Sequence, residues 1–259
     1  MLSWSEPQFI AFILLLFRLS AFFVVWPVFH VSSVPVQVKI LMSVAVAIMV
    51  FPLIDKSGYV KGVGDTLIIW FVIKEVFIGV TMAYLARLFF YIFNIAGDII
   101  SISMGLSGVQ LLNPNFGGRS SAIEQFLMII ATLFFISIDG HHLLLMGITD
   151  SFRLVPVFQN SISLGGFEMA TLLLKEITEM GLKICAPAMV SILFMNLALA
   201  IIGKAVPQFN VLITSLPVNI LFGFKVLFVS MPILMWQMDA FLEMTVSRLF
   251  QFVLSLIHI

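Results

Sequence analysis

The chain has 259 residues, of which 61% are hydrophobic and 10% are charged, with 13 basic and 13 acidic side chains. Its mean hydropathy of +1.17 and its few charges exclude an ordinary water-soluble globule, because such a protein needs a charged surface over its core. The formal net charge of zero argues against a nucleic-acid partner, and the single cysteine, Cys185, excludes a disulfide framework within the chain.

Apolar stretches separated by short segments of Gly, Pro and charge predict an all-α, integral membrane-type protein of about six long hydrophobic helices. They cover residues 8–29, 35–54, 65–104, 122–149, 177–204 and 211–236. A helix rises about 1.5 Å per residue and the bilayer core is about 30 Å thick, so each stretch is long enough for roughly a membrane span. We expect one domain over residues 1–259, with N-terminal helices to 104, a loop at about 105–121, C-terminal helices to 236 and an amphipathic tail, 237–259.

Charged residues interrupt the apolar stretches. Arg18 lies within the first one, where a mid-helix arginine costs about 2.5–3.5 kcal/mol on insertion, and the Phe, Ile, Leu and Val residues around it outweigh that cost. The charges in or beside the later stretches are Lys74, Glu75, Arg87, Asp98, Lys204 and Lys225. Ionisable groups in such segments normally face protein or water.

Prolines lead to the same expectation. They lie within or at the edges of the apolar stretches, at Pro27, Pro52, Pro187, Pro217 and Pro232. A proline removes a backbone donor, and neighbouring helices can satisfy the freed carbonyl whereas lipid cannot. We therefore expect proline-broken helices that are enclosed largely by other protein, in preference to a plain six-span bundle.

A polar seam follows one face of the third stretch. Its members are spaced three or four residues apart and so share one side of a helix: Tyr84, Arg87, Tyr91, Asn94, Asp98 and Ser101. The polar seam can line an aqueous or ion path, with Arg87 and Asp98 as charges at different depths. We favour the simpler interpretation, in which its Tyr, Asn and Ser side chains find hydrogen-bond partners on neighbouring helices.

The segment that follows the polar seam is predicted to leave the helix. Small residues at alternate positions from Ser101 to Ser107 precede a run of strong turn formers. The candidate loop residues are Val109, Leu111, Leu112, Asn113, Pro114, Asn115, Phe116, Gly117 and Gly118. The apolar ones are too hydrophobic for a solvated surface loop, so the loop is either a constriction or plug facing a cavity, or a connector packed on a neighbouring helix. The residues alone leave both interpretations open.

The run Asp139-Gly140-His141-His142 suggests a metal site or a proton relay at first sight. Adjacent histidines on a helix point about 100° apart and cannot easily share one ion. Asp139 before Gly140 is typical of a helix break with an N-cap, and we predict that structural role.

A helical hairpin is predicted near the C-terminus. Two uncharged apolar runs, residues 184–203 and 205–224, meet at Lys204, and Pro207-Gln208-Phe209-Asn210 forms the reversal of the hairpin. Lys204 would lie at the end of the first helix, where a cation complements the exposed carbonyls. The candidate assembly residues of this hairpin are Asn196, Lys204, Pro207, Gln208, Asn210 and Pro217.

No residue pattern points to catalysis. The chain lacks the G-x-S-x-G, H-E-x-x-H, P-loop and dinucleotide-binding motifs, and Gly62-x-Gly64 lacks a third glycine. We therefore expect no enzyme activity, no cofactor and no metal.

Several motifs together resemble the FliR family, the R subunit of the flagellar type III protein export gate, and its SpaR/YscT-type injectisome relatives. The resemblance covers nearly the whole chain. It rests on Arg18 with the Pro27, Pro35 and Lys39 region, on MGLSGVQLLNPNFGG at 104–118, on Asp139-Gly140-His141, and on Asn196-Leu197-Ala198-Leu199 leading to Pro207-Gln208-x-Asn210. The NPNFGG run looks like the flagellar branch.

This resemblance implies a gating subunit of a bacterial type III secretion system. A single R copy would close a helical ring of P and Q subunits, next to the B and A membrane proteins of the export apparatus. The gate would admit unfolded substrate polypeptides at the bacterial inner membrane, in the centre of the flagellar basal body, with much of it above the bilayer plane. The family also places a plug in the loop at about 106–121, with Val109, Leu111, Leu112 and Phe116 as seal candidates.

An alternative function is a small secondary transporter. In that case the polar seam between Arg87 and Asp98 would be the substrate path, and the broken helices would form a site at the bilayer midplane. The two functions differ in assembly, because a gate subunit needs its partners to cover its apolar surfaces.

Overall fold

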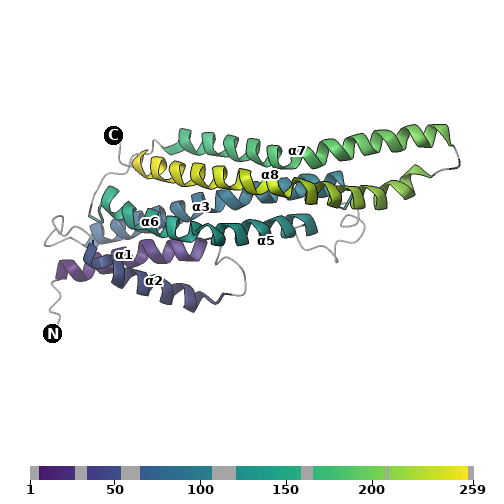
Figure 1. Cartoon of the computed structure of the whole chain (residues 1–259). Coiled ribbons are helices and arrows are strands. Elements are labelled where there is room, and N and C mark those ends of the chain that lie inside the picture. Colours follow the sequence, from purple (N-terminus) through teal and green to yellow (C-terminus); the bar gives the residue numbers. More distant parts are fainter. Residues whose placement is uncertain are drawn as a thin grey trace. The chain divides into compact units, whose positions relative to one another are not determined.

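The computed structural model describes residues 6–26, 34–53, 65–106, 121–158, 166–206, 208 and 210–255. All regular elements in these ranges are helical (Figure 1). They are α1 (Glu6–Val25), α2 (Val36–Val50) with the 3-10 turn η2 (Phe51–Leu53), α3 (Asp65–Ser103), α5 (Ala122–Ser137), α6 (Gly140–Leu154), α7 (Gly166–Ala205) and α8 (Val211–Ser255).

The all-α, membrane-type prediction is confirmed. Five helices are long and apolar enough to cross a membrane, and α5 with α6, bent at the break between them, makes a possible sixth span. The predicted third stretch, 65–104, matches α3 closely. The fifth predicted stretch, 177–204, is longer in the structure, because α7 begins at Gly166. Helix α8 continues to Ser255, through most of the segment that we expected to be a separate tail.

The prolines do not break the long helices. Pro187 lies inside α7, and Pro217 and Pro232 lie inside α8, each within continuous helix. A proline deletes only one backbone hydrogen bond, and a long apolar helix with packed neighbours can absorb that loss. The break occurs instead at Asp139, whose φ of 56° is left-handed and stops α5 before Gly140 starts α6.

The chain divides into two compact units, with the division falling inside α3, α7 and α8. Unit 1 comprises Met1–Leu88, Asp139–Leu173 and Glu243–Ile259. Unit 2 comprises Phe89–Ile138 and Leu174–Leu242.

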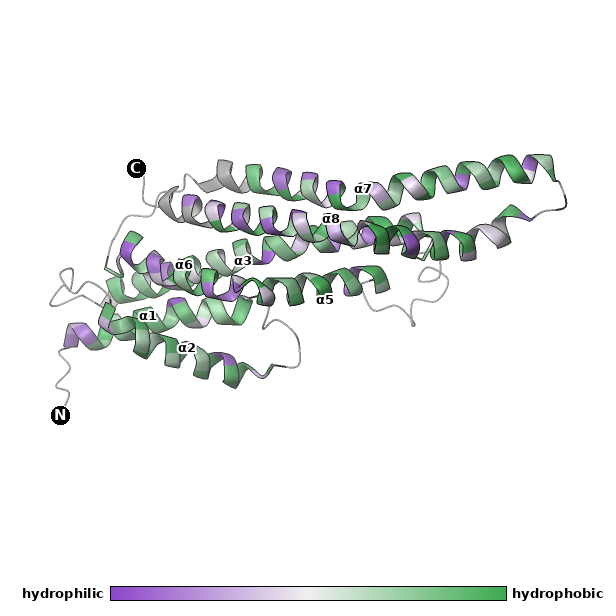
Figure 2. Ribbon diagram, viewed as in Figure 1, coloured by the Kyte–Doolittle hydropathy of each residue, from purple (hydrophilic) through white to green (hydrophobic). Residues whose placement is uncertain are grey.

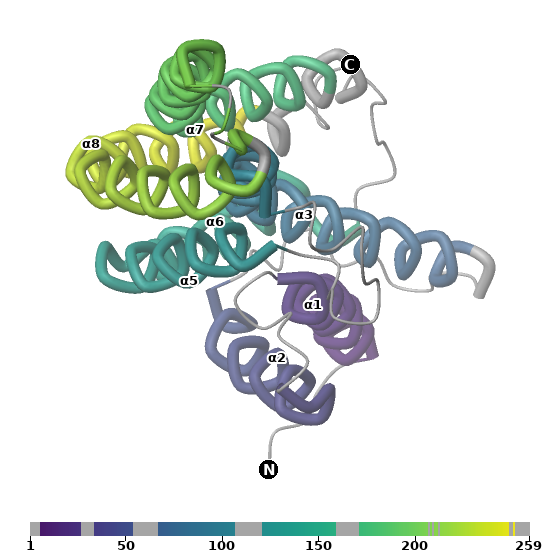
Figure 3. Tube along the Cα trace, turned by 90° about the vertical axis from the view of Figure 1, so that its right-hand side faces the viewer, coloured from purple at the N-terminus to yellow at the C-terminus, as the bar shows by residue number. Residues whose placement is uncertain are grey.

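Unit 1 packs α1 beside α2, as Figure 3 shows, and packs α1 against the first half of α3. The crossing of α1 and α3 is close at Gly79, where an added Cβ would overlap the backbone carbonyl of Arg18. The fully buried apolar side chains of α1 and of the first half of α3 include Leu14, Leu15, Leu19, Phe22, Phe23 and Ile78.

Unit 2 is built around an aromatic cluster and several glycine contacts. Phe135 of α5 packs its ring on Phe89 and Phe90 of α3, with centroids 6.0 and 5.5 Å apart. At Gly97 the two helices approach so closely that a Cβ would lie 2.5 Å from Glu124 Cα. The helices α7 and α8 run side by side in opposite directions (Figures 1 and 3).

The outer surfaces of α7 and α8 are apolar toward the hairpin that joins them. Of the 18 consecutive residues that form the most apolar part of α3, 61% are buried, whereas in α7 and in α8 only 28% of the corresponding residues are buried. Figure 2 shows hydrophobic residues covering most of the hairpin end of these helices. The most exposed large side chains include Phe194, Ile201, Leu221, Phe228 and Trp236. Neighbouring molecules, protein or lipid, must therefore cover this surface.

Candidate functional site

A buried charge network lies in the core of unit 1. Arg18 of α1 donates from Nε to Glu75 Oε2 of α3 over 2.5 Å, and Lys74 Nζ lies 3.1 Å from Glu75 Oε1. The three side chains are completely buried. Glu75 therefore bridges two cations in an apolar environment, which is where an ion pair is least screened.

The remaining donors of the network reach the end of α6. Arg18 Nη2 donates to the carbonyl of Val155 (2.9 Å), and Nη1 donates to Ser151 Oγ (3.0 Å). Lys74 Nζ donates to the carbonyls of Pro156 (3.1 Å) and Val157 (2.7 Å). These carbonyls follow the last turn of α6, where the helix dipole is negative, so they stabilise the excess positive charge of two cations against one carboxylate.

The charge network explains how three polar residues are accommodated among apolar helices. The sequence indicated that Arg18, Lys74 and Glu75 must face protein or water, and the structure confirms that they face protein. Their mutual pairing was missed. The available signal was the presence of opposite charges in two apolar stretches, since each charge requires a partner there.

The loop predicted as a plug lies outside the described residues. This applies to each of its candidates, Val109, Leu111, Leu112, Asn113, Pro114, Asn115, Phe116, Gly117 and Gly118. Both flanks are described, and both carry local signals that end a helix.

The first flank ends α3 with a Schellman motif. Leu106 N donates to the carbonyl of Ser101 and Gly105 N to that of Ile102, each over 3.0 Å. Gly105 has a φ of 81°, a left-handed conformation that glycine adopts without strain. Met104 is fully buried against Gly223 of α8, where an added Cβ would come within 2.7 Å of the methionine side chain. The expected helix exit is confirmed at this point.

The second flank starts α5 with a capping box. Ser121 Oγ accepts from Glu124 N, and Glu124 Oε2 accepts from Ser121 N, each over 3.1 Å. This reciprocal pair satisfies two backbone donors of the first turn. The loop is thus bounded by two locally encoded helix ends within unit 2.

The polar seam on α3 does not form a continuous hydrogen-bonded row. Tyr84, Tyr91 and Asp98 are exposed, and Arg87 and Asn94 are half-buried. In the described parts of the chain, Asn94 Oδ1 and Ser101 Oγ are buried without a hydrogen-bond partner. The favoured interpretation, hydrogen bonding to neighbouring helices, is therefore not met at these two atoms. Asp98 instead lies beside the carboxyl group of Glu124 at the start of α5.

The predicted hairpin is present. Helix α7 ends at Ala205 after Lys204, which is exposed, and α8 begins at Val211. Asn210 is the N-cap of α8, because its Oδ1 accepts from Ile213 N over 3.3 Å. Gln208 and Pro217 are exposed, and Pro207 falls outside the described residues.

A polar pair joins the two helices of the hairpin. Asn219 Nδ2 of α8 donates to Asn196 Oδ1 of α7 over 2.7 Å. Asn219 is buried, whereas Asn196 lies on the exposed apolar surface between Leu193 and Leu197. Within unit 2 this bond fixes the register of α7 against α8, since a shift of either helix would leave both amides unpaired. The sequence marked Asn196 but not its partner.

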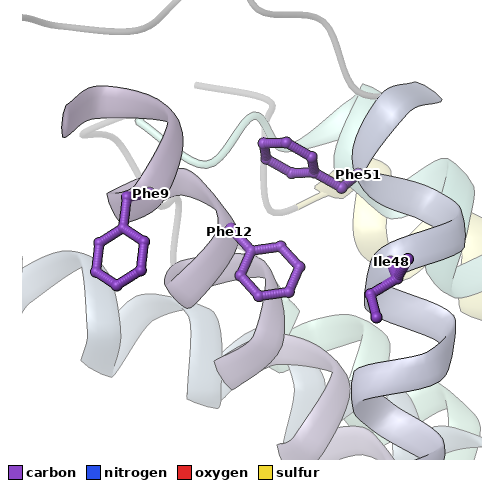
Figure 4. Close-up of a pocket in the computed structure, with 4 residues that line it drawn as sticks. All are labelled: Phe9, Phe12, Ile48 and Phe51. Atoms are coloured by element: carbon purple, nitrogen blue, oxygen red, sulfur yellow. The ribbon is translucent and has the colours of Figure 1, made fainter. Parts of the chain in front are cut away.

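An apolar groove opens between α1 and α2 in unit 1. It has a volume of about 450 Å³ and is lined by Phe9, Phe12, Ile48 and Phe51 (Figure 4). All four described lining residues are apolar, so none of them offers a polar group to orient a substrate.

Comparisons with known proteins agree with the resemblance in the sequence. The family model of bacterial export proteins, family 1, matches residues 9–245. The flagellar biosynthetic protein FliR of Bacillus subtilis is 33% identical over 229 residues, covering 87% of this chain and 88% of that protein. The FliR proteins of Pectobacterium carotovorum and Aquifex aeolicus are each 26% identical, covering 90% and 89% of this chain and 87% and 88% of their own lengths.

The charge network predicts an ordered set of stability losses. Glu75→Gln leaves Arg18 and Lys74 as buried cations with only neutral carbonyl and hydroxyl acceptors, and we expect a cost of about 3–5 kcal/mol. Lys74→Met should cost less, because the Arg18–Glu75 pair stays intact. Thermal unfolding of the purified protein in detergent measures both changes.

Asp150→Asn is the matched control. It removes a pair with Arg153 on the surface of α6, where the two side chains are 42% and 69% exposed, and should cost under about 1 kcal/mol. Equal losses for Glu75→Gln and Asp150→Asn would contradict the role given to the charge network.

Proposed function

Because the chain belongs to the bacterial export proteins of family 1, we propose that it is the gating subunit that helps form and close the pore for unfolded flagellar export substrates. The match over residues 9–245 and its flagellar relatives make it a subunit of the flagellar export apparatus. Its several long apolar helices and its FliR relatives support a place in the inner membrane. The comparisons give no support to the alternative of a small secondary transporter.

The proposed gate is the loop between α3 and α5. Its apolar candidates, Val109, Leu111, Leu112 and Phe116, are unsuited to free solvent and would instead narrow a protein-lined pore. The support for this proposal is that both adjoining helices end through local signals, at Gly105 and at Ser121. A loop whose ends are fixed in this way can change conformation between closed and open states without unwinding α3 or α5.

The observation that carries the assembly role is the apolar outer surface of α7 and α8. In unit 2 this surface presents Phe194, Ile201, Leu221 and Phe228 with little polar cover. We propose that P and Q export subunits cover it in a helical hetero-oligomer with one R copy, alongside the B and A membrane proteins. This complex would lie at the centre of the basal body, with much of it above the bilayer plane.

The mechanism proposed is steric and requires no catalytic group. The loop blocks ions while the gate is closed, and a substrate polypeptide displaces the loop as it enters. The chain has no nucleotide-binding motif, so the energy for transport would come from the partner subunits.

Deleting residues 110–118 should leave the complex assembled but leaky to small ions, because the seal is lost while the helix ends at Gly105 and Ser121 remain. Membrane conductance of cells or proteoliposomes that carry the complex measures the leak. Co-purification of the other gate subunits measures assembly. Normal conductance with normal assembly would contradict the proposal that this loop seals the pore.

Substitutions in the hairpin between α7 and α8 should impair assembly of the complex, whereas the loop deletion should not. Asn210→Ala removes the N-cap of α8, at a cost of about 1 kcal/mol, and should reduce recovery of partner subunits in co-purification. Changes at Pro207 and Gln208 should act in the same direction. Asn210→Asp keeps a capping oxygen and is the matched control. Normal assembly with altered conductance in Asn210→Ala would reverse the roles of hairpin and loop.

A further inference from the structure

The turn between α5 and α6 differs from its predicted structural role. The break occurs as expected, and Asp139 occupies the N-cap position, but its side chain makes no capping hydrogen bond in the described structure. Instead, Asp139 Oδ1 lies 3.2 Å from His142 Nδ1. The carboxylate is therefore directed toward an imidazole and not toward the backbone donors of α6.

The rings of the two adjacent histidines lie close together in the first turn of α6. The rings of His141 and His142 have centroids 4.2 Å apart, with an angle of 37° between their planes. One ligand atom from each of Asp139, His141 and His142 lies within 4.8 Å of the other two. The geometric objection drawn from the sequence, that adjacent histidines diverge, does not apply to this turn.

A second observation concerns the unused nitrogen of His141. Its Nδ1 is buried and has no hydrogen-bond partner among the residues that the structure describes. Buried polar atoms normally have a partner, and leaving one without a partner is costly. Coordination of an ion by His141 would hold the imidazole ring in its observed position.

We propose that Asp139, His141 and His142 form a site for a divalent transition metal of the zinc class. Two imidazole nitrogens and one carboxylate oxygen suit zinc and its neighbours in the first transition row, whereas magnesium and calcium require oxygen ligands. The 3.2 Å between the Asp139 and His142 ligand atoms matches an edge of a tetrahedron with bonds of about 2.0–2.1 Å. Small side-chain rotations bring the third ligand to the same ion.

The site is open on one side. The side chains of Asp139 and His142 are 73% and 61% exposed, so water can occupy the fourth position, as it does in zinc sites with three protein ligands. The carboxylate supplies one negative charge, and no Lys or Arg pairs with it in the described part of the chain. A metal bound here would link the residues on either side of Gly140 and hold the left-handed turn at Asp139 in place.

Zinc binding to the purified full-length protein, stripped of metal with a chelator, tests this site. Titration with zinc chloride against a fluorescent zinc indicator should show about one site per chain. The variants His141→Gln, His142→Gln and Asp139→Asn should each weaken zinc binding by at least about tenfold. Losses of that size are typical even for residues that only hydrogen-bond to a metal ligand. Zinc should also raise the melting temperature of the unaltered protein but not that of the variants.

Asp150→Asn is the control, because it removes a carboxylate from the same helix outside the cluster and should leave zinc affinity unchanged. The proposal is overturned if the unaltered protein binds no more zinc than the His142→Gln protein, or if Asp150→Asn weakens binding as much as Asp139→Asn does. The melting temperatures without metal show whether each variant is folded. This test does not depend on the gate proposal, because it measures binding and not export.

Discussion

The structure depends on one constraint: a charge inside an apolar helix bundle must find its partner within the protein. Glu75 meets this constraint for both Arg18 and Lys74, and their remaining donors bind carbonyls and a hydroxyl at the end of α6. The Glu75 carboxylate connects α3 to α1 through Arg18, and the two cations connect both helices to the end of α6 by hydrogen bonds. Within unit 1, breaking the Arg18–Glu75 pair by a shift of α1 along α3 would leave a buried charge without its partner, so the pair favours one register of these two helices.

Unit 2 follows the opposite arrangement. Its described ion pair, Lys183–Glu179, is exposed, and its core is held by stacked phenylalanines, by close glycine contacts and by the Asn196–Asn219 bond. Charge is thus buried in unit 1, while large hydrophobic side chains are exposed in both units, among them Leu41 and Met49 of α2 and Phe228 of α8. Neighbouring molecules must cover these surfaces, and we propose that they are other polypeptides.

The features that were predictable from the sequence are those with local causes. The end of α3 at Gly105, the capping box at Ser121 and the N-cap at Asn210 each depend on a few neighbouring residues. The features that were missed depend on distant contacts. The continuity of α7 through Pro187 requires neighbours that compensate the lost bond, and the partners of Arg18 and of Asn196 lie on other helices. The left-handed φ of Asp139 and the approach of the His141 and His142 rings are set by backbone and side-chain conformations that periodicity does not encode.

The central claim, that protein covers the apolar surface of α7 and α8 in the working apparatus, can be tested at Phe228, which is 80% exposed. The only native cysteine, Cys185, is buried, so Phe228→Cys provides one accessible site for a nitroxide spin label. Its collision rates with oxygen and with a water-soluble nickel chelate are measured by electron paramagnetic resonance in the assembled membrane complex. The account predicts low collision rates with both reagents, as in a protein interior. A high oxygen collision rate in the assembled complex, as for a lipid-facing side chain, would contradict it.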